Sequence, residues 1–244
     1  MSNDRTDFFA LYDINGKLLT TNSADGSKAE TGLILGDGLS NKIKISLLEK
    51  TSPELRLYGV VNEDMANYVR QAIMFLEAGA QPPSLKATIT STGGSVLAGM
   101  EIGSILSGYS GGVHGHVQRY AYSAAAQYIL MGCLIRYAHK YSRLLFHYVR
   151  ASIFVSEHEL SGHNRINQTF KDLKESNDQT VEILMERTGR TEREVRKLLC
   201  KGHVMTAKEC KDFGLIDVVY SNKVTKTVDP TGNARFKQNL IIEQ

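Results

Sequence analysis

The chain has 244 residues, of which 42% are hydrophobic and 23% charged, and its formal net charge is +3 at pH 7. These values are typical of a globular protein that buries its own core. They exclude a membrane-spanning helix, because no apolar run reaches about 18 residues, and the balance of 29 basic and 26 acidic residues gives nucleic-acid binding no support.

The start of the chain and its cysteines indicate the cellular compartment in which the protein is expected. The polar start of the chain is not expected to act as a secretory leader. Cys133, Cys200 and Cys210 are too scattered for a disulfide framework or a metal knuckle. We therefore expect reduced thiols in a cytoplasmic protein with no membrane partner.

The first 53 residues differ from the rest. Residues 8–19 contain two short apolar runs on either side of Asn15-Gly16, which predicts a β-hairpin. Ile43, Ile45 and Leu47 alternate with polar residues, which predicts a half-buried strand. No catalytic group stands out here, so residues 1–53 are predicted to be a β-rich N-terminal extension of unknown function.

From residue 54 onwards strands and helices alternate. Strands are predicted over 55–59, 86–90, 113–118 and 144–147, and helices over about 62–76, 96–106 and 123–131. Asn62 is placed to cap the first of these helices. The alternation predicts an α/β fold with a mostly parallel sheet and helices packed on it.

Residues 157–187 carry the longest helical pattern. Its apolar stripe consists of Ile166, Phe170, Leu173, Val181 and Leu184. The pattern fits packing on the chain's own sheet and packing on a partner equally well. Thr191 with Glu194 predicts a capping box for the next helix. Residues 221–244 are polar and are predicted to be a tail or a loose terminal strand.

Three places could carry chemistry. The double glycine in Ser91-Thr92-Gly93-Gly94-Ser95-Val96 is either a tight turn or a set of free N–H groups that can hold an anion or an oxyanion. Ser123 begins a predicted helix, so it is either a cap or a nucleophile. His147 closes a predicted strand, and it is either structural or a general base for a serine at a neighbouring strand end.

A metal site is less well supported. His114 and His116 share one face of a strand by the period of two, but no third ligand is evident nearby. His158 and His163 are expected to be solvated. No metal and no cofactor are predicted.

The order of these features resembles one family, the proteolytic subunit of the Clp protease, ClpP. The stretches that carry the resemblance are residues 62–67, 75–78, 91–96, 98–100, 142–147, 205–207 and 213–217. They cover about residues 54–220. The resemblance implies ClpP/crotonase-like repeated ββα units with a protruding handle helix at about 157–187, and a tail at 221–244.

The resemblance also implies roles. Ser123 would be the nucleophile and His147 its base, with an oxyanion hole made by the N–H groups of Gly94 and Ala124. Members of the family cleave polypeptides inside homo-oligomers of two stacked seven-membered rings, fed by a separate AAA+ ATPase unfoldase. The chain has no P-loop of its own.

One departure concerns the catalytic triad. The position of the family's third member, an Asp, is held by Gly202. Loss of the orienting carboxylate costs a triad roughly 10⁴-fold in rate. The alternatives are a weak Ser–His dyad, a poorly active ring subunit, or a substitute acceptor such as a backbone carbonyl, an Asn, Asp172 or Asp178. Thr92, Ala125 and His203 also depart from the family's Pro, Gly and ring-contact Arg.

Four functions are therefore open. They are a compartmentalised serine endopeptidase, a catalytically impaired structural or regulatory ring subunit, a viral-type processing protease of the same fold, and an acyl-CoA-binding relative of the crotonases. The last has no use for a Ser–His pair, so the sequence favours a peptidase.

Overall fold

The computed structural model describes residues 9–12, 18–22, 53–78, 81–152, 164–228 and 234–243. Its centre is a mixed sheet in the order β10-β9-β6-β5-β4-β3-β1-β2, with β7 and β8 paired to each other and β7 joined to β5. The pairs formed by β3, β4, β5, β6 and β9 are parallel, as is the β5–β7 pair. The predicted α/β fold with a mostly parallel core is confirmed.

The strands span β1 Phe9–Tyr12, β2 Leu18–Asn22, β3 Glu54–Val61, β4 Leu85–Gly94, β5 Val113–Tyr122, β6 Ile135–His139, β7 Arg143–Leu145, β8 Val204–Thr206, β9 Val218–Val228 and β10 Ala234–Glu243. The helices span α2 Glu63–Glu77, α3 Val96–Gly108, α5 Asn164–Thr188, α6 Glu192–Lys201 and α7 Ala207–Phe213. A π-helix, η1, spans Ala125–Leu130. Among the described residues, no helix is both long and apolar enough to cross a membrane.

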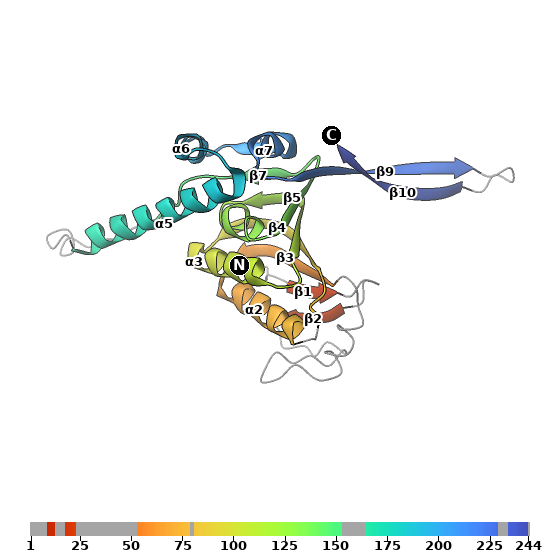
Figure 1. Cartoon of the computed structure of the whole chain (residues 1–244), viewed down its shortest axis with the longest axis horizontal. Coiled ribbons are helices and arrows are strands. Elements are labelled where there is room, and N and C mark those ends of the chain that lie inside the picture. Colours follow the sequence, from red (N-terminus) through yellow and green to blue (C-terminus); the bar gives the residue numbers. More distant parts are fainter. Residues whose placement is uncertain are drawn as a thin grey trace, which may run out of the picture.

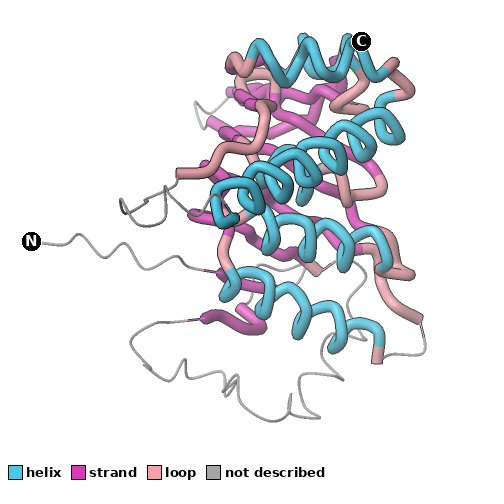
Figure 2. The backbone as a smooth tube through the Cα atoms, turned by 90° about the vertical axis from the view of Figure 1, so that its left-hand side faces the viewer, coloured by secondary structure: helices cyan, strands magenta, loops and turns pink. Residues whose placement is uncertain are grey.

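The helices form a layer over one face of the sheet, as Figure 2 shows. Alternate strand residues point to this layer, and Leu55, Leu57, Ala87 and Ile89 among them are fully buried. This burial is the main source of stability for the parallel core, since each buried Leu or Ile side chain contributes roughly 1.5–3 kcal/mol on leaving water.

Several local predictions are confirmed. The Asn62 side chain accepts a hydrogen bond from the N–H of Met65 at 2.9 Å and so caps α2. Thr191 and Glu194 form the predicted capping box of α6. β1 and β2 pair antiparallel as a hairpin, and β1 also pairs with β3, which adds the hairpin to the main sheet.

Other predictions differ from the structure or fall outside it. Strand β6 was not predicted, and the helix after Ser123 is a π-helix. The strand predicted around residues 43–47 and the first part of the helix predicted from residue 157 lie outside the described residues. The division into an extension, a core and a tail remains a prediction.

Helix α5 divides into two parts. Val181 and Leu184 near its C-terminal end are 3% and 0% exposed, because they pack into the core of the domain. Phe170, further out, is 59% exposed, and Figure 1 shows this part of the helix projecting from the body. The apolar stripe therefore serves the chain's own core at one end only.

The C-terminal segment forms a second projection. β9 starts beside β6 and then runs outward, paired with β10 from Val219 to Val228. Figure 1 shows this hairpin extending to the side opposite α5. The segment predicted as a tail or a loose terminal strand is a paired strand here, and backbone pairing between two strands satisfies the polar groups that a single strand would leave open.

Candidate active site

The double glycine ends β4 and lies against two other segments. Gly93 has a φ of +87°, and a Cβ built on it would lie 2.5 Å from the carbonyl oxygen of Tyr122 and 2.7 Å from the Cβ of Ser123. Only glycine allows this approach. The buried Ser91 hydroxyl accepts a hydrogen bond from the Gly93 N–H at 3.1 Å, which fixes the local chain. The double glycine, predicted to be either a tight turn or a set of free N–H groups, is therefore the last part of strand β4.

Ser123 adopts a backbone conformation that is rare for its residue type. Its φ is +53°, and it is the one non-glycine residue with positive φ in the described ranges. Its N–H donates to the carbonyl of Leu145 at 2.9 Å, and its carbonyl accepts from the N–H of Gln127 at 2.8 Å. Such strain costs of order 1–3 kcal/mol and is concentrated at functional sites.

The cap interpretation of Ser123 does not match the structure. The N-cap of η1 is Ala124, and no side chain caps this helix. The first N–H groups of a helix have no partner within it, and that of Ala124 is one of them. A Cβ on Gly93 would lie 3.0 Å from this nitrogen, so the glycine leaves the space beside the Ala124 N–H open. Gly94 follows as the last residue of β4.

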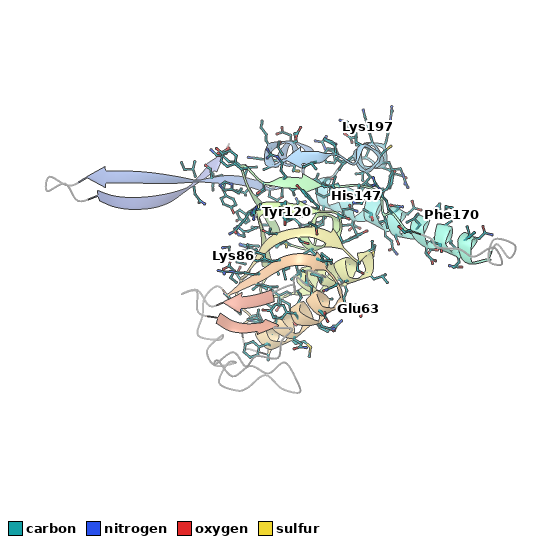
Figure 3. The ribbon with its side chains drawn as sticks, turned by 180° about the vertical axis from the view of Figure 1, so that it is seen from behind. Glu63, Lys86, Tyr120, His147, Phe170 and Lys197 are labelled. Carbon is teal, nitrogen blue, oxygen red and sulfur yellow. The ribbon has the colours of Figure 1, made fainter. Side chains whose placement is uncertain are left out.

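His147 lies close to Ser123 by strand topology. β5 and β7 are parallel, with Tyr122 opposite Leu145. Ser123 follows this pair by one residue and His147 by two, so both emerge at the same edge of the sheet. Figure 3 shows His147 where the inner end of α5 meets the strands. Ser123 and His147 are both half-buried, which leaves them open to a substrate.

The environment of His147 is formed mainly by backbone and amide groups. Its N–H donates to the side-chain oxygen of Gln127 at 3.1 Å, and its ring Nδ1 lies 2.6 Å from the carbonyl oxygen of Tyr148. The N–H of Val149 donates to the side-chain oxygen of Asn177 on α5 at 2.7 Å. Gln127 itself is 1% exposed.

Gly202 lies where the resemblance places the third triad member. It ends α6 with a φ of +53°, and a Cβ built on it would lie 3.4 Å from the Cβ of His147. The position is therefore adjacent to the histidine but provides no carboxylate.

The two acids considered as substitutes are engaged elsewhere. Lys174 and Arg196 donate to Asp178 at 2.7 and 2.8 Å, and these bonds lower the pKa of its carboxyl. Asp172 accepts from Gln168 at 2.6 Å. In the part of the chain that the structure covers, neither acid hydrogen-bonds His147.

Sequence reasoning did not identify Gln127 or Asn177. Gln127 is the one polar residue in a buried run that begins Ala124-Ala125-Ala126, and that isolation was a usable signal. Asn177 carries no such signal, because it lies among other polar residues of a charged helix.

The histidine pair on β5 has a packing role in the structure. His116 stacks on Tyr137 with ring centroids 4.4 Å apart, and His114 lies 6.0 Å from the same ring. Burial, with Lys86 and His114 nearby, lowers the pKa of His116 to about 4. No three His, Cys, Asp or Glu side chains of the described residues are placed to hold a metal ion together.

Comparison with known protein families gives a direct result. The family model for the Clp protease matches residues 40–223, well over half of the chain. The chain belongs to the Clp protease family, which is a family of peptidases.

Proposed function

We propose that this chain is a serine endopeptidase subunit that cleaves polypeptides through an acyl-enzyme at Ser123, with His147 as the general base. Membership of the Clp protease family supports a peptidase. The observation that carries the assignment is the strained Ser123, wedged against Gly93 and one residue beyond a strand whose partner leads to His147.

The proposed reaction has two matched halves. The Oγ of Ser123 attacks the scissile carbonyl carbon while Nε2 of His147 takes the hydroxyl proton. The tetrahedral intermediate then collapses, the C–N bond breaks, and His147 returns the proton to the leaving amine. Water then attacks the acyl carbon while His147 takes one of its protons; the bond between this carbon and Oγ breaks, His147 returns the proton to Oγ of Ser123, and the carboxylic acid product leaves.

The backbone supplies the oxyanion hole in this proposal. The N–H groups of Ala124 and Gly94 would bind the negative oxygen that exists only in the tetrahedral intermediate, so they would accelerate the reaction without binding the substrate more tightly. Support comes from the position of Ala124 at the start of η1 and from the absence of a Cβ at Gly93 beside it.

The same proposal includes the family's assembly. We infer a homo-oligomer of two stacked seven-membered rings, fed with unfolded polypeptides by a separate AAA+ ATPase. The outer part of α5 supports this, because a projecting helix with an exposed Phe170 has apolar surface to bury against another subunit.

The test is labelling with a fluorophosphonate, which reacts with activated serines. The assembled wild-type chain should be modified at Ser123, and Ser123→Ala and His147→Ala should lose the label. Ser107→Ala serves as a matched control, since this exposed serine on α3 hydrogen-bonds only the nearby Ser104 carbonyl among the contacts found, and it should label normally. An unlabelled wild-type ring would refute the peptidase.

A second candidate is a catalytically impaired ring subunit, which Gly202 favours. It predicts normal assembly, seen by native mass spectrometry, without fluorophosphonate labelling. The intact Ser123 and His147 favour the active enzyme, and the two outcomes of the labelling experiment separate the candidates.

A further inference from the structure

His147 lacks a carboxylate beside its ring, but the ring is not without a fixed partner. Nδ1 lies 2.6 Å from the carbonyl oxygen of Tyr148. A carbonyl oxygen can only accept, so the proton of this hydrogen bond must be on Nδ1. The neutral ring therefore has its lone pair on Nε2, which is the tautomer that a base for Ser123 needs.

We propose that the Tyr148 carbonyl takes over the orienting role of the missing triad Asp, and that Gln127 and Asn177 are positioning residues that hold this carbonyl in place. The catalytic role of the oriented ring rests on the proposed function. That the carbonyl fixes the tautomer of His147 does not depend on that function.

The carbonyl lies in a short segment that two amide side chains hold. The N–H of Val149, in the same peptide unit as the carbonyl, donates to Asn177 at 2.7 Å, and the N–H of His147, two peptide units earlier, donates to Gln127 at 3.1 Å. Asn177 thus fixes the peptide unit that contains the carbonyl, and Gln127 fixes the peptide unit that precedes the Cα of His147.

The elements that carry the two amides are themselves connected. Tyr128, the neighbour of Gln127 on η1, has its hydroxyl 2.6 Å from the hydroxyl of Thr180 on α5. Thr180 is 0% exposed and lies three residues after Asn177. Hydrogen bonds therefore join the segment 147–149 to η1 through Gln127 and to α5 through Asn177, and join η1 to α5 through Tyr128 and Thr180, so the carbonyl cannot turn away without losing such a bond.

A carbonyl is a weaker substitute than a carboxylate. It fixes the tautomer equally well, but its partial charge stabilises the imidazolium less, because hydrogen bonds to ionised acceptors are roughly twice as strong. The proposal therefore predicts an enzyme that works without the Asp and gains from having it restored.

The first test observes the histidine directly. The full-length assembled chain, labelled with ¹⁵N-histidine, would be studied by magic-angle-spinning NMR, with His147→Ala to assign the signal. Wild type should show one neutral tautomer, protonated at Nδ1. Asn177→Leu should populate the other tautomer, while Asn177→Asp, which keeps the acceptor, and Gln179→Leu, at an exposed position of α5, should match wild type.

The second test measures peptide hydrolysis with and without a carboxylate restored at position 202. Asn177→Leu and Gln127→Met should each lower kcat for peptide hydrolysis by about tenfold, with little change in KM. In a Gly202→Asp background the same changes should cost less than about threefold, because the new carboxylate orients the ring instead. Asn177 is half-buried, so its variants remain informative if Gln127→Met fails to fold.

The outcomes distinguish the two proposals. An unchanged tautomer in Asn177→Leu, or equal losses of kcat in both backgrounds, would overturn the role of the carbonyl while leaving the peptidase intact. A shifted tautomer in a chain whose Ser123 does not react with fluorophosphonate would support the carbonyl and refute the peptidase.

Discussion

Ser123 and His147 emerge from neighbouring strand ends, yet different kinds of contact hold them. On the nucleophile side, which consists of Gly93, Ser123 and Ala124, the main chain of β4 touches the main chain before η1. The base side consists of His147, Tyr148 and Gly202. There, amide side chains hold the backbone, and Gly202 leaves the position beside His147 without a side chain.

This difference determines how each side tolerates change. Close contacts between main-chain segments leave no room for added atoms, since protein interiors are packed like crystals. Hydrogen bonds from side chains can be lost or replaced one at a time. We therefore expect the nucleophile side to fail on any enlargement and the base side to accept graded changes, including one that improves it.

The largest expected effect is at Gly93. Gly93→Ala would place a Cβ 2.5 Å from the Tyr122 carbonyl oxygen and cover the N–H of Ala124. Fluorophosphonate labelling of Ser123 should fall by at least about 100-fold, as for loss of an oxyanion donor. Gly108→Ala is the control, because its added Cβ meets no atom within 4 Å. A Gly93→Ala chain that labels like wild type would contradict the expectation that the nucleophile side fails on any enlargement.

The next effect is a gain on the base side. Gly202→Asp places a carboxylate beside His147, in a left-handed conformation that Asp and Asn tolerate better than most residues. Peptide hydrolysis should rise by about tenfold, because a charged acceptor stabilises the imidazolium more than a carbonyl does. Gly202→Asn, which has the same shape without the charge, should show less than half of this gain on a logarithmic scale. A fall in rate would mean that the Tyr148 carbonyl already suffices.

A smaller effect concerns the strain at Ser123. Ser123→Gly and Ser123→Ala both remove the nucleophile, but only glycine adopts a φ of +53° without strain. We expect the glycine variant to be more stable than the alanine variant by about 1 kcal/mol, measured as the free energy of unfolding in urea. Equal stabilities would show that the turn at Ser123 stores no strain.

The smallest effect is expected at Asp217, which belongs to neither the nucleophile side nor the base side and therefore serves as a control. Burial alone would raise the pKa of Asp217, but hydrogen bonds from the Arg136 side chain and N–H outweigh it and hold the pKa of this carboxyl below its usual range. A depressed folded pKa gives stability that is present above the unfolded pKa and is lost as the pH falls through the folded value. Unfolding midpoints at pH 7, 4 and 3 should show this loss in wild type and less of it in Asp217→Asn. Labelling of Ser123 at pH 7 should be the same in both.

The sequence predicted the elements whose signals are local. The caps at Asn62 and Thr191 and the core strands β3, β4 and β5 follow from patterns within a few positions. Local patterns left a cap open for Ser123 and a structural role open for His147, and only the family resemblance paired the two residues, whose roles remain predictions. Strand β6 was missed because it contains Arg136, whose burial depends on Asp217, which lies far along the chain.

The base side was the least predictable part of the candidate site. Gly202 was identified only as a missing carboxylate. The group that faces Nδ1 is a backbone carbonyl, which every residue has, so no residue type marks it. Gln127 reaches a backbone N–H twenty residues away, and only the folded chain shows that contact.

The cysteines have a practical consequence for these experiments. Cys133 and Cys210 are 0% exposed, and burial raises the pKa of Cys133 to about 12, whereas Cys200 is exposed. Thiolates are the reactive form, so a maleimide dye should attach selectively at Cys200. That residue is in the last turn of α6, two positions before Gly202. The natural chain thus has its own attachment point for an optical reporter beside the base side, without any added mutation.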